Sequence, residues 1–195
     1  MNPLVSLLVG LAISISDPCS VPPGYMNNTS RTEGDLKFTF AMDEFVYSES
    51  DTIRFHYIVE NIGQDTFYVN WGIDPMYAFF IYPDSCFTLD QPGCFDEAIY
   101  YYPQIVYYYS EGIHLLPGEC KVFSESWDQS KNTDVTPGPG SYRVFGGLWK
   151  PDPGPSWPGS FQLQSELALE IVIEDPIETD VQSWGRIKSL HNSDR

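Results

Sequence analysis

A period-two alternation of apolar and polar residues, repeated in short segments between turns, is the feature that most constrains the fold of this chain. The clearest segment is 53–60. Its apolar positions are Ile53, Phe55, Tyr57 and Val59. This spacing places one row of side chains toward a core and the other toward solvent, as in a half-buried strand. An amphipathic helix would instead repeat its apolar positions every three or four residues.

Several other segments show the same character and are bounded by Pro, Gly, Asn and Asp. They are 36–40, 66–71, 76–82, 104–110, 119–126, 141–149 and 161–174. Short apolar segments punctuated by turn residues are typical of all-β domains. No helical stripe of useful length precedes the C-terminus. The sequence therefore predicts an all-β fold, specifically an antiparallel Ig-like β-sandwich.

The length of 195 residues suits one domain with a single core. We expect a signal peptide at 1–16, a linker at 17–34, the sandwich at 35–175 and a tail at 176–195. In the tail, apolar residues recur at three-residue steps. They are Val181, Trp184, Ile187 and Leu190. This spacing predicts a short amphipathic helix, and a disordered or loosely docked terminus is the alternative.

The beginning of the chain has the character of an export signal. An apolar run extends from Leu4 to Ile15 and is followed by small residues. The run is too short to span a bilayer, but it has the length of the apolar part of a secretory signal. We therefore expect an exported protein, periplasmic, cell-surface or extracellular, without a membrane span. A buried N-terminal strand is the alternative.

The charge of the chain excludes one class of partner. The formal net charge is -17, and only 10 residues are Lys or Arg. Binding to nucleic acid or to an anionic membrane surface needs clustered basic residues. We therefore expect no nucleic-acid partner.

Four cysteines in an exported chain indicate disulfides, with three possible pairings. Cys86 and Cys94 are the natural pair, because Pro92 and Gly93 supply a turn that brings the two sulfurs together. Cys19 and Cys120 would then remain, and their bond would tie the N-terminal segment to a strand. No CxxC pair or nearby His has the spacing of a zinc site, so we expect no metal.

The sequence does not suggest a catalytic site. The three histidines are His56 on a strand, His114 before a turn and His191 in the tail, and none lies in a recognisable Ser/His/Asp or Cys/His set. Segment 128–134 has oxygen ligands at alternating positions, but it lacks the central Gly and terminal Glu of a calcium loop. We expect no catalytic residues, no cofactor and no enzymatic activity.

Two stretches carry a resemblance to a known family. "LLPGECKVFSESWDQ" followed by "PGPGSYRVFGGLW" resembles the motif of BsuPI proteinase inhibitor domains, in which a strand follows a Leu-x-Pro-Gly-Glu turn, ends at a Trp and returns after a loop at Pro-Gly-x-Tyr. The matching positions are Pro117, Gly118, Glu119, Trp127, Pro139, Gly140 and Tyr142. The segment "FHYIVENIGQDTFYVNW" is similar to the family's strand, Asn-centred turn and second strand. The resemblance covers about residues 35–150 and implies an Ig-like sandwich.

The resemblance also implies that the chain is a proteinase inhibitor. Inhibition requires a loop that is rigid before the protease binds. One candidate is the ring closed by Cys86 and Cys94, which has the size of the inhibitory loop of Bowman-Birk inhibitors. Its candidate contact residues are Phe87, Thr88, Leu89 and Asp90. The other candidate is the loop 128–140.

A second hypothesis is an Ig-like interaction module without inhibitory activity. Its support is the tyrosine-rich stretch 98–112, because tyrosine rings bind protein or glycan with little loss of side-chain entropy. Half of these tyrosines would face the core if the stretch is a strand. The expected partner is therefore a protein, such as a protease, or a glycan.

Overall fold

The computed structural model describes residues 17–70, 75–86, 98–103, 112–130, 137–151 and 161–175, with side chains described except at 149–151 and 161–165. Within these residues the chain forms only strands. They are β1 (Asn27–Glu33), β2 (Leu36–Met42), β3 (Val46–Ser48), β4 (Ile53–Asn61), β5 (Phe67–Val69), β6 (Tyr77–Pro83), β7 (Tyr100–Tyr102), β8 (Ile113–Leu115), β9 (Cys120–Trp127), β10 (Gly140–Pro151) and β11 (Phe161–Glu174).

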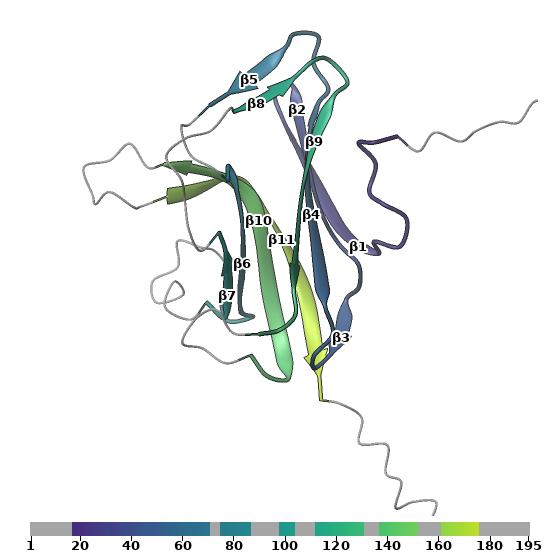
Figure 1. Cartoon of the computed structure of the whole chain (residues 1–195), viewed down its shortest axis with the longest axis vertical. Coiled ribbons are helices and arrows are strands. Elements are labelled where there is room, and N and C mark those ends of the chain that lie inside the picture. Colours follow the sequence, from purple (N-terminus) through teal and green to yellow (C-terminus); the bar gives the residue numbers. More distant parts are fainter. Residues whose placement is uncertain are drawn as a thin grey trace, which may run out of the picture.

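The strands form an Ig-like β-sandwich (Figure 1). One sheet has the order β1-β2-β4-β9, and the facing sheet has the order β3-β11-β10-β6-β7. A small third sheet pairs β5 with β8 at one end of the sandwich. All neighbouring strands run antiparallel except β3 and β11, which are parallel. The predicted fold class is thus confirmed for the described residues.

The alternation in β4 has the predicted structural consequence. Ile53, Phe55 and Tyr57 are fully buried, whereas Arg54 is exposed. Phe79 of β6 stacks on Phe55 at 5.3 Å between ring centroids, so the aromatic core joins the two sheets. Burial of such large aromatic side chains is the main stabilising contribution in a core of this kind.

Gly146 of β10 lies where an aromatic ring of the facing sheet comes close to the backbone. A Cβ atom added there would lie 3.0 Å from two ring carbons of Phe40 on β2 and 3.2 Å from the Phe79 ring. A glycine in the middle of a strand often marks such a close approach. Here it allows the Phe40 ring to pack directly against the β10 backbone.

The sandwich begins earlier in the sequence than we expected. Residues 27–33, assigned to a linker, form β1, which pairs with the whole length of β2. β1 escaped prediction because its sequence NNTSRTE has no apolar row, so its place at the sheet edge depends largely on backbone pairing with β2. Its buried Asn27 donates Nδ2 to the carbonyl of Glu170 at 2.9 Å, a bond from β1 to β11 in the facing sheet.

Other strand boundaries also differ from those we expected, and some expected segments lie outside the described residues. The expected strand 66–71 is shortened to β5, and the short strands β3, β7 and β8 were not predicted. Three-residue strands carry too little alternation to be recognised in a sequence. The expected signal peptide 1–16, the strand 104–110 and the tail 176–195 lie outside the described residues. In the described part, no helix could cross a bilayer.

Candidate functional site

The entry to loop 128–140 is fixed by Trp127, the last residue of β9. Its ring is buried, with a relative exposure of 1%, and lies 5.4 Å from the ring of Tyr100. Its Nε1 donates to the carbonyl of Ser130 at 2.7 Å. A buried indole usually finds such an acceptor. Trp127 therefore anchors the first turn of the loop to the core.

Two further side chains hold the same end of the loop. The Asp128 carboxylate accepts a hydrogen bond from the Ser130 backbone N–H at 3.0 Å. Hydrogen bonds from Ser130 lower the pKa of the Asp128 carboxyl. Gln129 donates Nε2 to the carbonyls of Ser48 at 2.7 Å and Asp51 at 3.0 Å. These last bonds connect the loop to the turn between β3 and β4.

The exit from the loop is fixed by Tyr142 of β10. Its hydroxyl donates to the carbonyl of Gly138 and accepts from the Gly138 backbone N–H, at 3.1 Å for the latter bond. The Tyr142 ring is buried. Both ends of loop 128–140 are therefore held by side chains that belong to the sandwich core. Residues 131–136, at the centre of the loop, lie outside the described residues.

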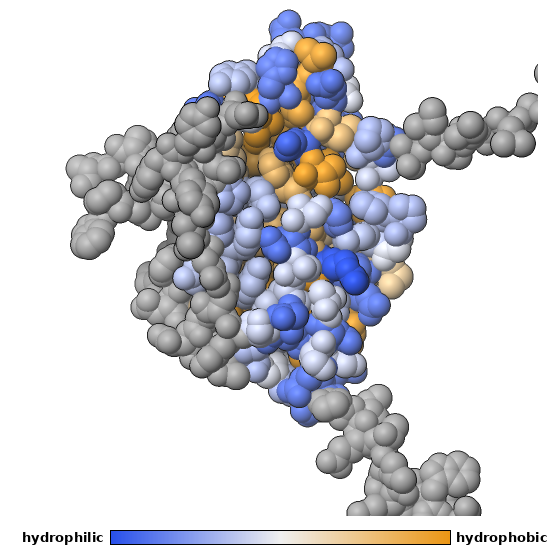
Figure 2. All heavy atoms as spheres, in the orientation of Figure 1, coloured by the Kyte–Doolittle hydropathy of each residue, from blue (hydrophilic) through white to orange (hydrophobic). Residues whose placement is uncertain are grey.

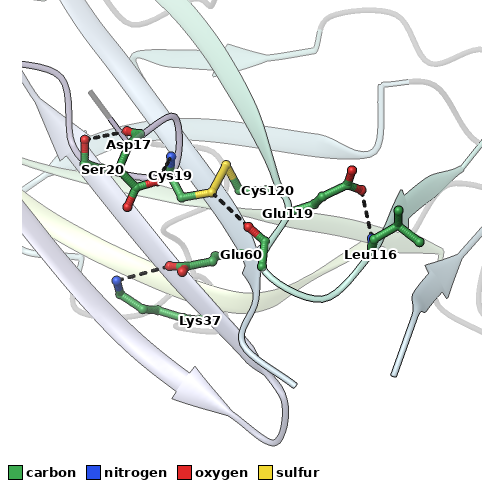
Figure 3. The surroundings of a disulfide bond; sticks show 9 residues. Asp17, Cys19, Ser20, Lys37, Glu60, Leu116, Glu119 and Cys120 are labelled. Atoms are coloured by element: carbon green, nitrogen blue, oxygen red, sulfur yellow. Dashed lines mark hydrogen bonds and ion pairs between the residues drawn. A yellow bond between two sulfur atoms is a disulfide. The ribbon is translucent and has the colours of Figure 1, made fainter. Parts of the chain in front are cut away.

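The Pro-Gly turn before β9 has the geometry that its residues favour. Glu119 N–H donates to the Leu116 carbonyl at 2.9 Å, which closes a turn with Pro117 and Gly118 at its centre. Gly118 has φ of +80°, a backbone conformation that glycine adopts without steric cost. The Glu119 carboxylate also accepts from the Leu116 N–H at 2.9 Å (Figure 3). This turn sets the register of β9.

The disulfide between Cys19 and Cys120 is present next to this turn (Figure 3). It confirms the second pairing considered from the sequence and ties the N-terminal segment to β9. A formed disulfide is typical of proteins in an oxidising compartment. Cys86 is buried and disulfide-bonded. Its expected partner, Cys94, lies outside the described residues, so the Cys86–Cys94 pairing stays a prediction.

The candidate contact residues of the ring also remain predictions. They are Phe87, Thr88, Leu89 and Asp90, and all four lie outside the described residues. The structure describes the start of the ring but not its end. At the start, directly after β6, the Cys86 N–H donates to the Pro83 carbonyl at 3.0 Å. Of the two loops considered from the sequence, loop 128–140 is thus the one whose two ends are described.

The fold brings His56 together with two residues that are distant in sequence. His56 Nδ1 lies 2.9 Å from Ser124 Oγ, and Nε2 is hydrogen-bonded to the Tyr25 hydroxyl. Burial lowers the pKa of His56, and the charge of Asp43 partly offsets this shift. Burial also raises the pKa of Tyr25. Desolvation favours the neutral form of both groups.

In the part of the chain that the structure describes, this Ser-His-Tyr set does not have the surroundings of a nucleophilic site. Ser124 and His56 are register partners on the outward face of β9 and β4. Backbone N–H groups of paired strands lie in the plane of the sheet, so they do not point at an oxyanion above that face. The arrangement instead holds Tyr25, and with it the N-terminal segment, on the sheet. Only the strand register reveals this contact, which the sequence could not show.

A tyrosine pair lies where β6 meets β7. Tyr77 and Tyr102 are stacked with ring centroids 5.3 Å apart, and their hydroxyls are 3.2 Å apart. Phe123 of β9 also stacks on Tyr77, with ring centroids 4.6 Å apart. Both tyrosines are half-buried. Tyr107 and Tyr109, in the second half of the tyrosine-rich stretch, lie outside the described residues.

The described residues contain no group of three or more His, Cys, Asp or Glu side chains arranged to hold a metal ion. Figure 2 shows the molecule in the orientation of Figure 1. The described part of this face is largely hydrophilic, and its apolar residues gather toward the end that carries β5 and β8. The exposed large apolar residues at this end include Ile62, Tyr68 and Leu116.

No family model matches the chain, and a search of curated proteins finds no match. Among solved structures, the C-terminal domain of Wzt is similar at a TM-score of 0.44 and 13% identity, over 84% of this chain and 88% of that one. A CARDB domain from Pyrococcus furiosus is similar at a TM-score of 0.36 and 15% identity, over 72% of this chain and 94% of that one.

A β-glucosidase from Listeria innocua is similar at a TM-score of 0.39 and 12% identity, over 74% of this chain but only 16% of the enzyme. Likenesses at this level of identity and score carry no information about ligand or activity. The assignment of the fold rests on the strands and sheets of the chain itself. The resemblance to BsuPI domains stays a prediction.

Proposed function

We propose that this chain is an exported Ig-like binding domain of the BsuPI type that contacts a protein through loop 128–140. The observation that carries the proposal is the fixing of both loop ends, by Trp127 and Gln129 at one end and by Tyr142 at the other. A loop that is ordered before binding loses less conformational entropy when it binds. Export is supported by the Cys19–Cys120 disulfide and by the apolar run at the start of the sequence.

The finer proposal is that the protein partner is a protease and that the loop inhibits it. A protease inhibitor needs a segment that resists rearrangement while it occupies the substrate cleft. The two anchored ends support this proposal, because they fix where the loop leaves the sandwich and where it returns. The chain then acts as a binding protein rather than an enzyme.

The test is an inhibition assay of the whole protein against subtilisin-like, trypsin-like and metalloprotease panels, with Tyr142→Phe as the variant. This change removes the two hydrogen bonds to Gly138 and keeps the buried ring. We expect the inhibition constant for the affected protease to rise about tenfold, which corresponds to a net loss of about 1.4 kcal/mol of binding free energy when both bonds are removed. Tyr47→Phe is the matched control, because this buried tyrosine donates its hydroxyl to Asp43 at 2.7 Å and not to the loop.

The outcomes separate the two candidate loops and the two candidate partners. If Cys86→Ser with Cys94→Ser weakens inhibition and Tyr142→Phe does not, the ring is the inhibitory segment and loop 128–140 is not. If no protease is slowed at micromolar protein, inhibition is wrong. The chain would then be an interaction module for a protein or a glycan, without inhibitory activity. The half-buried Tyr77–Tyr102 stack favours a glycan, because aromatic rings pack against sugars. Retention on immobilised glycans that Tyr102→Ala abolishes would support it.

A further inference from the structure

A small apolar patch is exposed at the β3 edge of the five-stranded sheet. Phe45, Val46 and Val172 have relative exposures of 52%, 44% and 37%, and we call them the β3 patch. Val46 and Val172 are register partners on β3 and β11, and the Val172 N–H donates to the Phe45 carbonyl at 2.9 Å. The three residues are therefore contiguous. Contiguous exposed apolar residues often mark a contact surface.

Carboxylates surround the β3 patch. Glu44, Glu49 and Glu174 are exposed beside it, and the Glu49 N–H donates to the Glu174 carbonyl at 3.2 Å. Two basic residues on nearby strands are already bonded to carboxylates. Arg143 contacts Glu170 at 2.7 Å, and Arg54 contacts Asp43 at 3.1 Å. The surroundings of the patch thus favour an apolar partner that also carries positive charge.

The chain contains a segment of this chemistry directly after β11. Its apolar residues are Val181, Trp184, Ile187 and Leu190. Between and beside them lie Arg186 and Lys188, and residues 181–190 contain no Asp or Glu. The whole segment 176–195 has three acidic and three basic residues, a sum of zero, so the net charge of -17 belongs entirely to residues 1–175.

The position of the segment in the chain also favours this contact. β3 runs beside the C-terminal end of β11 (Figure 1), and Val172 of the patch is near the last residue of that strand. An extended chain covers at most about 3.5 Å per residue, so the residues between Glu174 and Val181 can span roughly 20 Å. A short tether of this kind gives an effective concentration in the millimolar range. A second copy of the protein is a poorer occupant, because the carboxylates around its β3 patch would repel those of the first copy.

We propose that residues 181–190 dock on the β3 patch of the same molecule, with the apolar side chains on Phe45, Val46 and Val172 and the basic side chains toward the surrounding carboxylates. The docked segment covers the edge of β3 beside Val46, whereas the Ser48 N–H and carbonyl are already bonded to Asp51 and Gln129. Covering an edge strand is one way in which sheets avoid pairing with other chains. The contact is independent of any activity of loop 128–140.

The test uses the whole protein with the photocrosslinking residue p-benzoylphenylalanine in place of Phe45. We expect irradiation of dilute protein to link position 45 to the peptide 181–190 within one molecule, as identified by mass spectrometry. The matched control carries the same group in place of Tyr68, which is 59% exposed and lies on β5 in the separate small sheet. It should not reach the segment. Sodium chloride at about 0.5 M should lower the yield at position 45, because it screens exposed charges.

A second measurement keeps the proposal testable if crosslinking is inefficient. Trp184→Ser with Ile187→Ser removes half of the apolar stripe and leaves the sandwich unchanged. We expect the amides of Val46 and Tyr47 to exchange with deuterium at least several times faster in this variant. The proposal is wrong if their exchange is unchanged, if positions 45 and 68 link equally to the segment, or if position 45 links only to a second molecule.

Discussion

At the residue scale, Gly146 shows most directly how close packing restricts the sequence. A methyl group there would lie 3.0 Å from ring carbons of Phe40, closer than such atoms normally approach. We expect Gly146→Ala to lower the free energy of unfolding by about 1–3 kcal/mol, the usual cost of overpacking a core. Gly138→Ala is the control, because no atom lies within 4 Å of a Cβ there. Urea unfolding of the two variants measures the difference, and equal midpoints would show that the Phe40 ring moves aside freely.

At the element scale, the N-terminal segment is held on the outward face of β4 and β9. Cys19 is bonded to Cys120, and Tyr25 to His56, so the segment crosses β4 between Glu60 and His56. This position accounts for the burial of the outward-facing Ile58. The disulfide joins residues separated by 101 positions. We expect Cys19→Ser with Cys120→Ser to lower the free energy of unfolding by about 2–5 kcal/mol.

Tyr25→Phe is the comparison for that prediction, because it removes only the phenol–imidazole hydrogen bond. It should cost about 0.5–1.5 kcal/mol. Thermal and urea unfolding of both variants measure the two effects. If the cysteine variant is no less stable than Tyr25→Phe, the covalent bond adds nothing beyond the local contacts of the segment.

At the scale of the whole molecule, charge repulsion opposes the compact state. The chain has 27 acidic and 10 basic residues, so most carboxylates cannot be paired with a cation. We expect the melting temperature to rise between about 20 mM and about 500 mM sodium chloride, by about 2–4 °C for each 1 kcal/mol of repulsion that is screened. The rise should shrink near pH 4.2, the isoelectric point, because little net charge remains to be screened there. An equal rise at both pH values would indicate a general salt effect instead.

The sequence by itself determined the fold class and the longest strands. In β4, Phe55 and Tyr57 alternate with Arg54 and His56. This alternation turns one face of the strand toward the core and the other outward, because the side-chain period of a strand is fixed by its backbone. The turn at Pro117 and Gly118 was likewise predictable, since the φ preferences of these two residues are local. The burial of Trp127 was predicted from its size and from its position at the end of a strand.

Only the tertiary structure decided what depends on contacts between distant residues. β1 has no apolar row, so its place in the sheet follows from backbone pairing with β2 and from the Asn27 bond to β11. The sequence allowed loop 128–140 as a candidate, but it could not show that Gln129 bonds the β3–β4 turn. These contacts arise because strands far apart in the chain end at the same edge of the sandwich. Local patterns fix what each segment becomes, whereas the pairing order of the strands fixes which segments meet.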